Sequence, residues 1–259
     1  MDIEIKNRMH KTRTPLWISY AAVLVVLAIW EIFCRTDLIS PLFLPAPTQI
    51  LSALCVMTTS GELADNLTAS LIRISAGFLT GSVIGIVVGL ISGVSSLADR
   101  VATPFVDALY PIPKIALLPL FILWLGIGET SKIALIALGV FFPVALNTYA
   151  GAKNVPPLLL RVAVSFRARP LFLLSRVILP ASLPMIWAGL RIAAATSLLL
   201  VVAAEMIAAE KGIGALILRY GDLMLTDRLM AGLLVLSATG LLFRFLLNFA
   251  ARRIMPWKQ

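Results

Sequence analysis

Residues 77–93 read GFLTGSVIGIVVGLISG, an apolar run in which a glycine returns at every fourth position. The run belongs to a longer window, Ser70–Gly93, which has about the 20 residues that a helix needs to cross the bilayer core. A four-residue step keeps the glycines on one slowly drifting helical face, where a second helix can approach closely. We interpret this face as a helix-packing seam, with a role in helix sliding as the alternative. It consists of Gly77, Gly81, Gly85, Gly89 and Gly93.

Apolar windows continue along the rest of the chain. Its 259 residues are 60% hydrophobic and 14% charged, whereas about 25% of the residues of a soluble domain are charged. A further span joins Val101–Tyr110 to Ile115–Gly128 through a kink at Pro111 and Pro113. The other windows of membrane length are Leu16–Phe33, Ile133–Ala152, Met185–Ala209 and Leu229–Ala251. We therefore predict an all-α polytopic membrane protein with about six transmembrane helices, in one domain over residues 16–252 between tails at 1–15 and 253–259.

The net charge of +9 is concentrated in the connections between these windows. If the N-terminus is cytoplasmic, segments 1–15, 94–102, 153–184 and 252–259 face inward and hold 13 Lys and Arg residues, against five in the outer segments. Basic residues favour the cytoplasmic side of a membrane, so both termini and segment 153–184 are predicted to be cytoplasmic. The basic residues do not form one face with interleaved aromatics, which disfavours nucleic-acid binding.

The sequence lacks the residues of common catalytic sites. Its single histidine, His10, lies in the polar N-terminal tail, which excludes Ser-His triads and histidine metal sites. No phosphate-binding G-x-x-x-x-G-K-[ST] loop occurs. We expect no enzyme activity, metal or cofactor in this chain, so uphill movement of a solute would need energy from another protein. Cys34 and Cys55 both fall in or near the first outer loop, where a disulfide or two unpaired thiols are alternatives.

Charged residues within membrane spans are costly and are candidates for function. Arg73 and Glu205 fall towards the outer ends of their spans, and we consider them possible residues of a solute path. The alternative is that each anchors its span at the membrane surface. Arg191 and Arg244 are interpreted as anchors of this kind.

Residues 161–184 read RVAVSFRARPLFLLSRVILPASLP and carry four arginines and no acid. Pro156 and Pro157 can begin a helix, and Arg169-Pro170 should break it. A second short helix, LFLLSRVIL, should then end at Pro180. Two short helices with exposed apolar side chains suit a cytoplasmic docking element for a separate ATP-hydrolysing protein. The exposed side chains would be Phe166, Leu171 and Phe172. A basic loop that only sets the topology is the alternative.

Six segments together resemble the permease subunits of ATP-binding-cassette (ABC) importers, in the branch of taurine, alkanesulfonate and nitrate permeases. They include LISPLFLPAPTQIL (38–51), SLIRISAGF (70–78), YPIPKIALLPLFILWLGIGETSKI (110–133), GVFFPVALNTYAG (139–151), VILPASLPMIWAGLRIA (177–193) and VAAEMIAAEKGIGALI (202–217). The resemblance covers about residues 16–257 and implies a type I importer permease fold with a coupling-helix hairpin at 156–180. It also implies a bacterial inner (plasma) membrane, a permease homodimer, two ATPase subunits that bind ATP and Mg, and an extracytoplasmic solute-binding protein. The implied solute is a small anion such as a sulfonate, taurine or nitrate, with a pyrimidine or aromatic acid still open.

In this family the hairpin carries the pattern E-A-A-x-x-x-G-x(9)-I-x-L-P. Aligning it on Leu179-Pro180 puts Val177 at the isoleucine and Ala163 at the second alanine. Arg161 and Arg167 then stand at the positions of the acid and the glycine, so the bend could come from Pro170 instead. The resemblance implies that the hairpin contacts the ATPase through Arg161, Ala163, Phe166, Arg167, Arg169, Leu171, Phe172, Val177, Leu179 and Pro180.

Two other classes of membrane protein compete with this interpretation. An ion-coupled secondary transporter or a channel would work without an ATPase, and such transporters usually show inverted repeats or charged sites at mid-membrane. No repeat is evident here. A membrane enzyme is disfavoured by the lone histidine in the tail.

Overall fold

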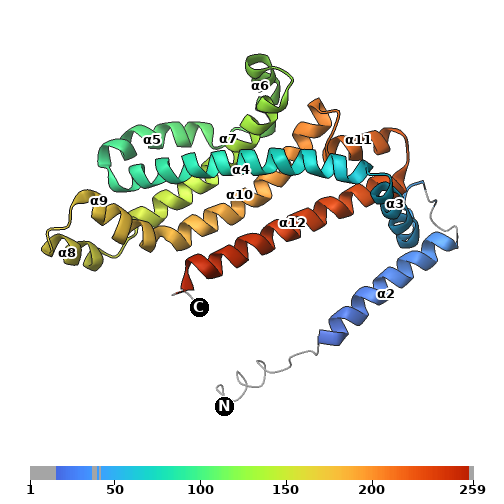
Figure 1. The fold of residues 1–259 in the computed structure, drawn as a ribbon, viewed down its shortest axis with the longest axis horizontal. Coiled ribbons are helices and arrows are strands. Elements are labelled where there is room, and N and C mark those ends of the chain that lie inside the picture. The colour runs from blue at the N-terminus through green and yellow to red at the C-terminus, as the bar shows by residue number, and fades with distance from the viewer. Residues whose placement is uncertain (1–15, 37–39, 41, 257–259) are drawn as a thin grey trace, which may run out of the picture.

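The computed structural model describes residues 16–36, 40 and 42–256 (Figure 1). The predicted N-terminal tail, residues 1–15 with His10, lies outside the described residues, as do residues 257–259 of the predicted C-terminal tail. Within the described ranges every regular element is a helix and no strand occurs. The prediction of an all-α fold is confirmed.

The helices follow one another with short connections. In chain order they are α2 (Leu16–Arg35), α3 (Pro47–Thr59), α4 (Glu62–Val94), α5 (Ser96–Leu109), the 3₁₀ turn η1 (Lys114–Leu117), α6 (Leu118–Leu125), α7 (Glu129–Lys153), α8 (Pro157–Ser165), α9 (Pro170–Leu173), the π-helical turn η2 (Leu174–Ile178), α10 (Leu179–Ala208), α11 (Ile213–Asp222) and α12 (Thr226–Ile254).

In the described part of the chain, four helical segments are long and apolar enough to cross a membrane: α4, α7, α12 and the continuous segment Pro170–Ala208 that contains α10. The span predicted around Pro111 is a pair of helices, α5 and η1–α6, bent by 91°. It makes a fifth span if the bent pair is one span. The remaining predicted window, Leu16–Phe33, coincides with α2, a helix of 20 residues. The polytopic helical architecture is confirmed.

The bend between α5 and η1 is held by a lysine. The Lys114 ammonium donates hydrogen bonds to the carbonyl oxygens of Leu109, Tyr110 and Ile112, at 3.1, 2.6 and 2.8 Å. Carbonyl oxygens at the C-terminal end of a helix have no partner within the helix, and the half-buried Lys114 cation satisfies those at the end of α5. The same ammonium lies 4.6 Å from the centroid of the Phe142 ring on α7. The bend is therefore tied to the central helices.

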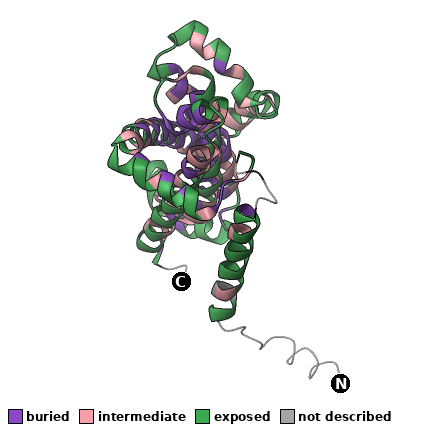
Figure 2. Ribbon diagram, turned by 90° about the vertical axis from the view of Figure 1, so that its right-hand side faces the viewer, coloured by how far each residue is buried: buried purple, intermediate pink, exposed green. Residues whose placement is uncertain are grey.

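The core lies between α4, α7 and α10, which run side by side (Figure 1). Most of the apolar residues with no exposed surface come from α7 and α10, and the others are Leu118 of α6 and Ala231 of α12. Those of α7 and α10 are Leu135, Ile136, Val140, Val144, Ala193, Val201 and Ala204. A smaller core joins α3, α11 and α12 around Met57, Leu216 and Ala231. Figure 2 shows the buried residues gathered in this central body, with α2 largely exposed along its length.

The glycines at every fourth position of α4 all face α7. A Cβ atom added to Gly81 would lie 2.3 Å from the carbonyl oxygen of Ala137, and one added to Gly89 would lie 2.5 Å from that of Ala145. Added Cβ atoms on Gly77, Gly85 and Gly93 would also come within 3.0 Å of α7 atoms. Only glycine allows the two backbones this separation, so the seam sets the distance between α4 and α7.

α2 is attached to α3 through its C-terminal turn. Glu31 accepts hydrogen bonds from the hydroxyl and the backbone amide of Thr48, at 2.7 and 3.1 Å, and pairs with Arg35 at 2.6 Å. Most of the apolar side chains of α2 are exposed. A surface of this kind suits contact with lipid or with another transmembrane helix.

Both described cysteines are free thiols. Cys34 is buried and its Sγ donates to the carbonyl oxygen of Leu44 at 3.4 Å, whereas Cys55 is exposed. Of the two alternatives from the sequence, the structure has the unpaired thiols.

Candidate functional site

A two-helix hairpin projects from one end of the bundle, between the end of α7 and the start of α10 (Figure 1). Its first helix, α8, begins at Pro157, which lies in the first turn where its missing N–H is not needed. The backbone is extended at Arg169, and α9 begins at Pro170, because the residue before a proline avoids the α region. The two helices lie where the sequence predicts them, but the first ends at Ser165, four residues before the predicted break at Arg169-Pro170.

α8 ends in a Schellman motif centred on an arginine. The amide of Arg167 donates to the carbonyl of Val164 at 2.8 Å, and the amide of Ala168 donates to that of Ala163 at 3.1 Å. Arg167 has φ +52°, the left-handed conformation that this motif normally gives to glycine. A non-glycine residue there costs about 1–2 kcal/mol. The bend is thus made at the position where the family pattern has its glycine, and not by Pro170 alone.

The predicted end of the second helix at Pro180 is wrong. α9 passes through the π-helical turn η2 directly into α10, so the helix runs on past this proline to Ala208. Pro180 falls in the first turn of the α-helical part, where a missing N–H is tolerated, and the wider π turn precedes it. The second arm of the hairpin is therefore rigidly continuous with a central helix.

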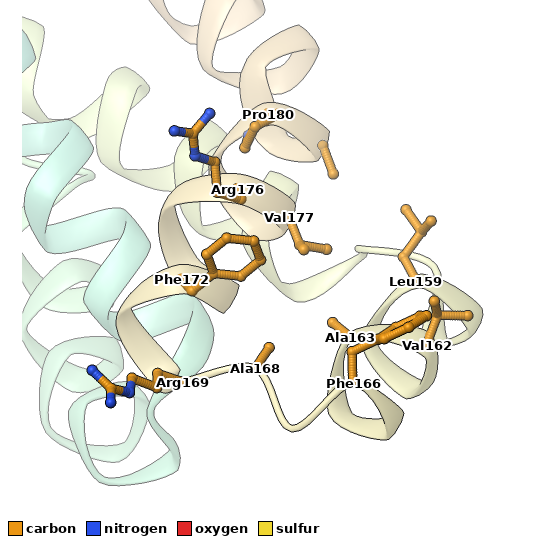
Figure 3. Close-up of a pocket in the computed structure, with 11 residues that line it drawn as sticks. Leu159, Val162, Ala163, Phe166, Ala168, Arg169, Phe172, Arg176, Val177 and Pro180 are labelled. Carbon is orange, nitrogen blue, oxygen red and sulfur yellow. The ribbon is translucent and has the colours of Figure 1, made fainter.

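An apolar groove of about 860 Å³ lies between the two arms of the hairpin (Figure 3). Leu159 and Val162 of α8 and Phe166 just after it face Phe172 and Val177 across the groove. The other lining residues are Ala163, Ala168, Arg169, Arg176, Pro180 and Ala181, so the lining has two cations and no carboxylate. The groove therefore suits an apolar side chain flanked by negative charge.

The remaining hairpin residues are placed as follows. Phe166 and Leu171 are 83% and 76% exposed, and Ala163 is buried against the hairpin. Arg161 and Arg167 are exposed and form no ion pair with any described residue. Leu179 is half-buried beside Pro180. Which of these residues touch an ATPase stays a prediction.

A buried charge cluster occupies the opposite end of the bundle. Arg73 of α4 donates to Glu129 of α7 through Nε at 2.5 Å and Nη2 at 2.8 Å, and to Glu205 of α10 through Nη1 at 2.7 Å. Glu205 has no exposed side-chain surface and Arg73 only 4%, whereas Glu129 is 57% exposed. One guanidinium thus joins three helices, with one partner in the interior and one at the surface.

Neighbouring groups complete the hydrogen bonds of this cluster. Glu205 also accepts from the hydroxyl of Ser70 at 2.8 Å and from the amide of Gly214 at 2.9 Å. Gly212 has φ +138°, and a Cβ atom there would lie 2.3 Å from the Glu205 carboxyl carbon. The segment between α10 and α11 is therefore folded tightly over the carboxylate, and a side chain at Gly212 would displace it.

The sequence singled out Arg73 and Glu205 separately and missed that they pair. Arg73 also borders a surface pocket of about 620 Å³ with Glu129 and Lys132, but Glu205 does not line it. The sequence did contain a signal for this pair, because it predicts the two opposite charges at the same end of their spans. A role of Arg73 and Glu205 in a solute path stays a prediction.

Long apolar helices around a tight core, with a two-helix projection between two of them, define a class of membrane transport subunit. The fold matches the MetNI methionine ABC transporter in inward-facing conformations, with a TM-score of 0.61 and 23% identity over 72% of this chain and 93% of that one. An amino acid ABC transporter gives a TM-score of 0.56 at 20% identity over 77% and 97%. The predicted type I ABC importer permease fold is confirmed.

The sequence comparisons identify the family. The chain is 37% identical to the taurine transport system permease protein TauC of Escherichia coli K12, over 99% of this chain and 98% of that protein. It is 34% identical to the putative aliphatic sulfonates transport permease protein SsuC of Bacillus subtilis 168, over 90% and 85%. The family of binding-protein-dependent transport system inner membrane components matches residues 81–258, and the chain belongs to it.

Membership confirms the predicted class of function. The protein is a permease subunit of an ABC importer in an inner membrane, and it works with an ATPase and a solute-binding protein. Its relatives are named as transport permeases, in line with a transport subunit.

Proposed function

We propose that two copies of this chain form the path of an ABC importer for a small sulfonate anion such as taurine. The observation that carries the proposal is the 37% identity to a taurine permease along 99% of the chain. A nitrate importer is the runner-up among small anions. The solute-binding protein delivers the anion on the outer side, and residues 16–252 of each copy form one transmembrane domain.

The orientation and the energy supply belong to the same proposal. The segments that the sequence assigns to the inner side carry 13 Lys and Arg residues against five in the outer segments, so the hairpin and both termini face the cytoplasm. Two ATPase subunits bind ATP and Mg there, and this chain holds no cofactor. Each ATPase contacts one hairpin, and because α9 continues into α10, a shift of the hairpin acts directly on a central helix.

ATP-driven taurine uptake tests the substrate. In proteoliposomes that contain the permease, its ATPase and its binding protein, ATP on the ATPase side is expected to drive taurine accumulation. Excess ethanesulfonate should compete with taurine, and excess nitrate should not. Equal competition by nitrate would overturn the sulfonate assignment. Uptake that persists without the ATPase and follows an ion gradient would instead favour a secondary transporter.

The hairpin should lose its ATPase when its exposed apolar side chains become charged. The double variant Phe166→Asp, Leu171→Asp is expected to weaken ATPase binding by about 2–4 kcal/mol, because buried aromatic anchors dominate interfaces. ATPase co-purification and uptake should both be lost, while the permease still elutes as a single species. The matched control is Phe43→Asp, since Phe43 is 77% exposed and lies outside the hairpin, between α2 and α3. Unchanged co-purification of the double variant would count against the hairpin as the docking element.

A further inference from the structure

A pocket of about 370 Å³ lies between α10 and α12 and shares no lining residue with the hairpin groove. Each helix contributes one face to it, with residues spaced by three and four positions. α10 contributes Arg191, Ala194, Ala195 and Leu198, and α12 contributes Gly240, Arg244, Leu247 and Asn248. The lining therefore contains two guanidinium groups, one amide and no carboxylate.

One buried hydrogen bond fixes the position of α10 relative to α12, and small residues on both helices leave the space that forms the pocket. The indole Nε1 of Trp187 donates to the carbonyl oxygen of Leu247 at 3.1 Å and fixes α10 against α12. A Cβ atom on Gly240 would lie 3.2 Å from Leu198 Cδ1, so the helices approach closely there. Ala194 and Ala195 leave the space beside this contact unfilled.

Both arginines are exposed and lie towards the inner ends of their predicted spans. Arg191 comes six residues after Met185, where its apolar window begins, and Arg244 comes seven residues before Ala251, where its window ends, or roughly 9 and 10 Å along the helix axes. Within the described residues neither guanidinium has a carboxylate within ion-pair distance. Two guanidinium groups that line one pocket within the apolar part of the helices, with no carboxylate beside them, favour an anion as their partner.

We propose that this pocket is an anion site of the permease, in which Arg191, Arg244 and Asn248 bind the sulfonate group of the solute. The inference rests on the proposed function and adds the residues that recognise the solute inside the membrane. A sulfonate offers three acceptor oxygens, which two planar guanidinium forks and one amide can satisfy with charge-assisted hydrogen bonds. The volume is at the small end of ligand pockets and suits a solute of a few heavy atoms. The phosphate of an anionic lipid shares this chemistry and is the competing source.

The test uses the full complex of permease, ATPase and binding protein with Arg191→Gln and Arg244→Gln, singly and together. Each substitution should lower the maximal rate of taurine uptake roughly tenfold, the effect of losing one charge-assisted contact. The KM should stay unchanged because the binding protein sets it. Arg→Lys at either position should restore part of the rate, since it keeps the charge but loses the fork. The control is Arg252→Gln, an exposed arginine of α12 outside the pocket.

A second measurement separates a binding role from a structural one. In phosphatidylcholine nanodiscs that hold the permease and its ATPase without the binding protein, taurine should raise the melting temperature of the wild-type permease but not that of the double Gln variant. Without taurine, the double variant should melt at the same temperature as the wild type or higher, because two unpaired charges are gone.

If the wild type takes up taurine and the variants match it, the site is wrong while the proposed function stands. If phosphatidylglycerol raises the wild-type melting temperature and taurine does not, the pocket binds lipid and the proposal is overturned. Absence of taurine uptake by the wild type would reject the proposed substrate itself.

Discussion

Glu205→Gln is expected to lower the free energy of unfolding of the permease by about 3–5 kcal/mol, the cost of removing one partner from a buried ion pair. The wild-type carboxylate has no exposed surface and accepts hydrogen bonds from Arg73, Ser70 and Gly214. Glutamine has the same shape, but its NH₂ group must face at least one of these donors. Unfolding in detergent titrated with SDS measures the loss.

The second carboxylate on the same arginine provides the matched control. Glu129 pairs with Arg73 at 2.5 Å but is 57% exposed, so Glu129→Gln should cost no more than about 1 kcal/mol. The double variant Glu205→Gln, Arg73→Gln should recover part of the stability lost by Glu205→Gln, because the guanidinium that has lost its buried partner is then removed. If Glu129→Gln and Glu205→Gln lowered the free energy of unfolding equally, the stronger contribution of the buried Glu205 would be contradicted.

The sequence located the membrane-spanning helices best. A spanning segment must satisfy its backbone internally and present apolar side chains to lipid, so its composition alone identifies it. The windows at Leu16–Phe33 and Ile133–Ala152 fall within α2 and α7. The helix ends were less accurate: α4 begins at Glu62, eight residues before the predicted window, because polar turns outside the core are still helical.

Short helices outside the spans were harder to predict. α3 was not predicted, although Pro47 in its first turn and Gln49, whose side chain accepts the Ala46 amide at 2.9 Å, are a recognisable helix start. The opposite error occurred at Pro180, where a local rule predicted a helix end. A π turn, which the sequence does not signal, carries the helix past this proline.

The two charged sites depend on contacts between distant parts of the chain. Arg73 and Glu205 are separated by 132 positions, and Arg191 and Arg244 lie on different helices. Periodicity within one segment says which face a residue occupies but not which residue of another helix faces it. Each arginine therefore had an ordinary explanation as a membrane anchor. Only the packing of α10 on α12 puts two of them in one pocket.

The last prediction concerns the α4–α7 seam, where steric overlap and helix propensity predict opposite signs for the change in stability. Gly81→Ala is expected to lower the free energy of unfolding by about 1–3 kcal/mol, the range for overpacking a close contact. A Cβ atom there would lie 2.3 Å from the carbonyl oxygen of Ala137, which cannot move without separating the helices. Helix propensity alone predicts the reverse, since alanine is favoured over glycine in a helix by about 0.5–1 kcal/mol.

A graded series makes the steric argument for the seam quantitative. The nearest atom to an added Cβ lies at 2.3 Å for Gly81, 2.5 Å for Gly89 and 2.9 Å for Gly85, so the losses on substitution by alanine should decrease in that order. Gly128 has no atom within 4 Å of an added Cβ and a negative φ, so Gly128→Ala should be close to neutral. If Gly81→Ala instead stabilises the permease in the SDS titration, the α4–α7 distance is not set by the glycines. The helices would then be held together by the side chains around the core of α7 and α10, which none of these substitutions alters.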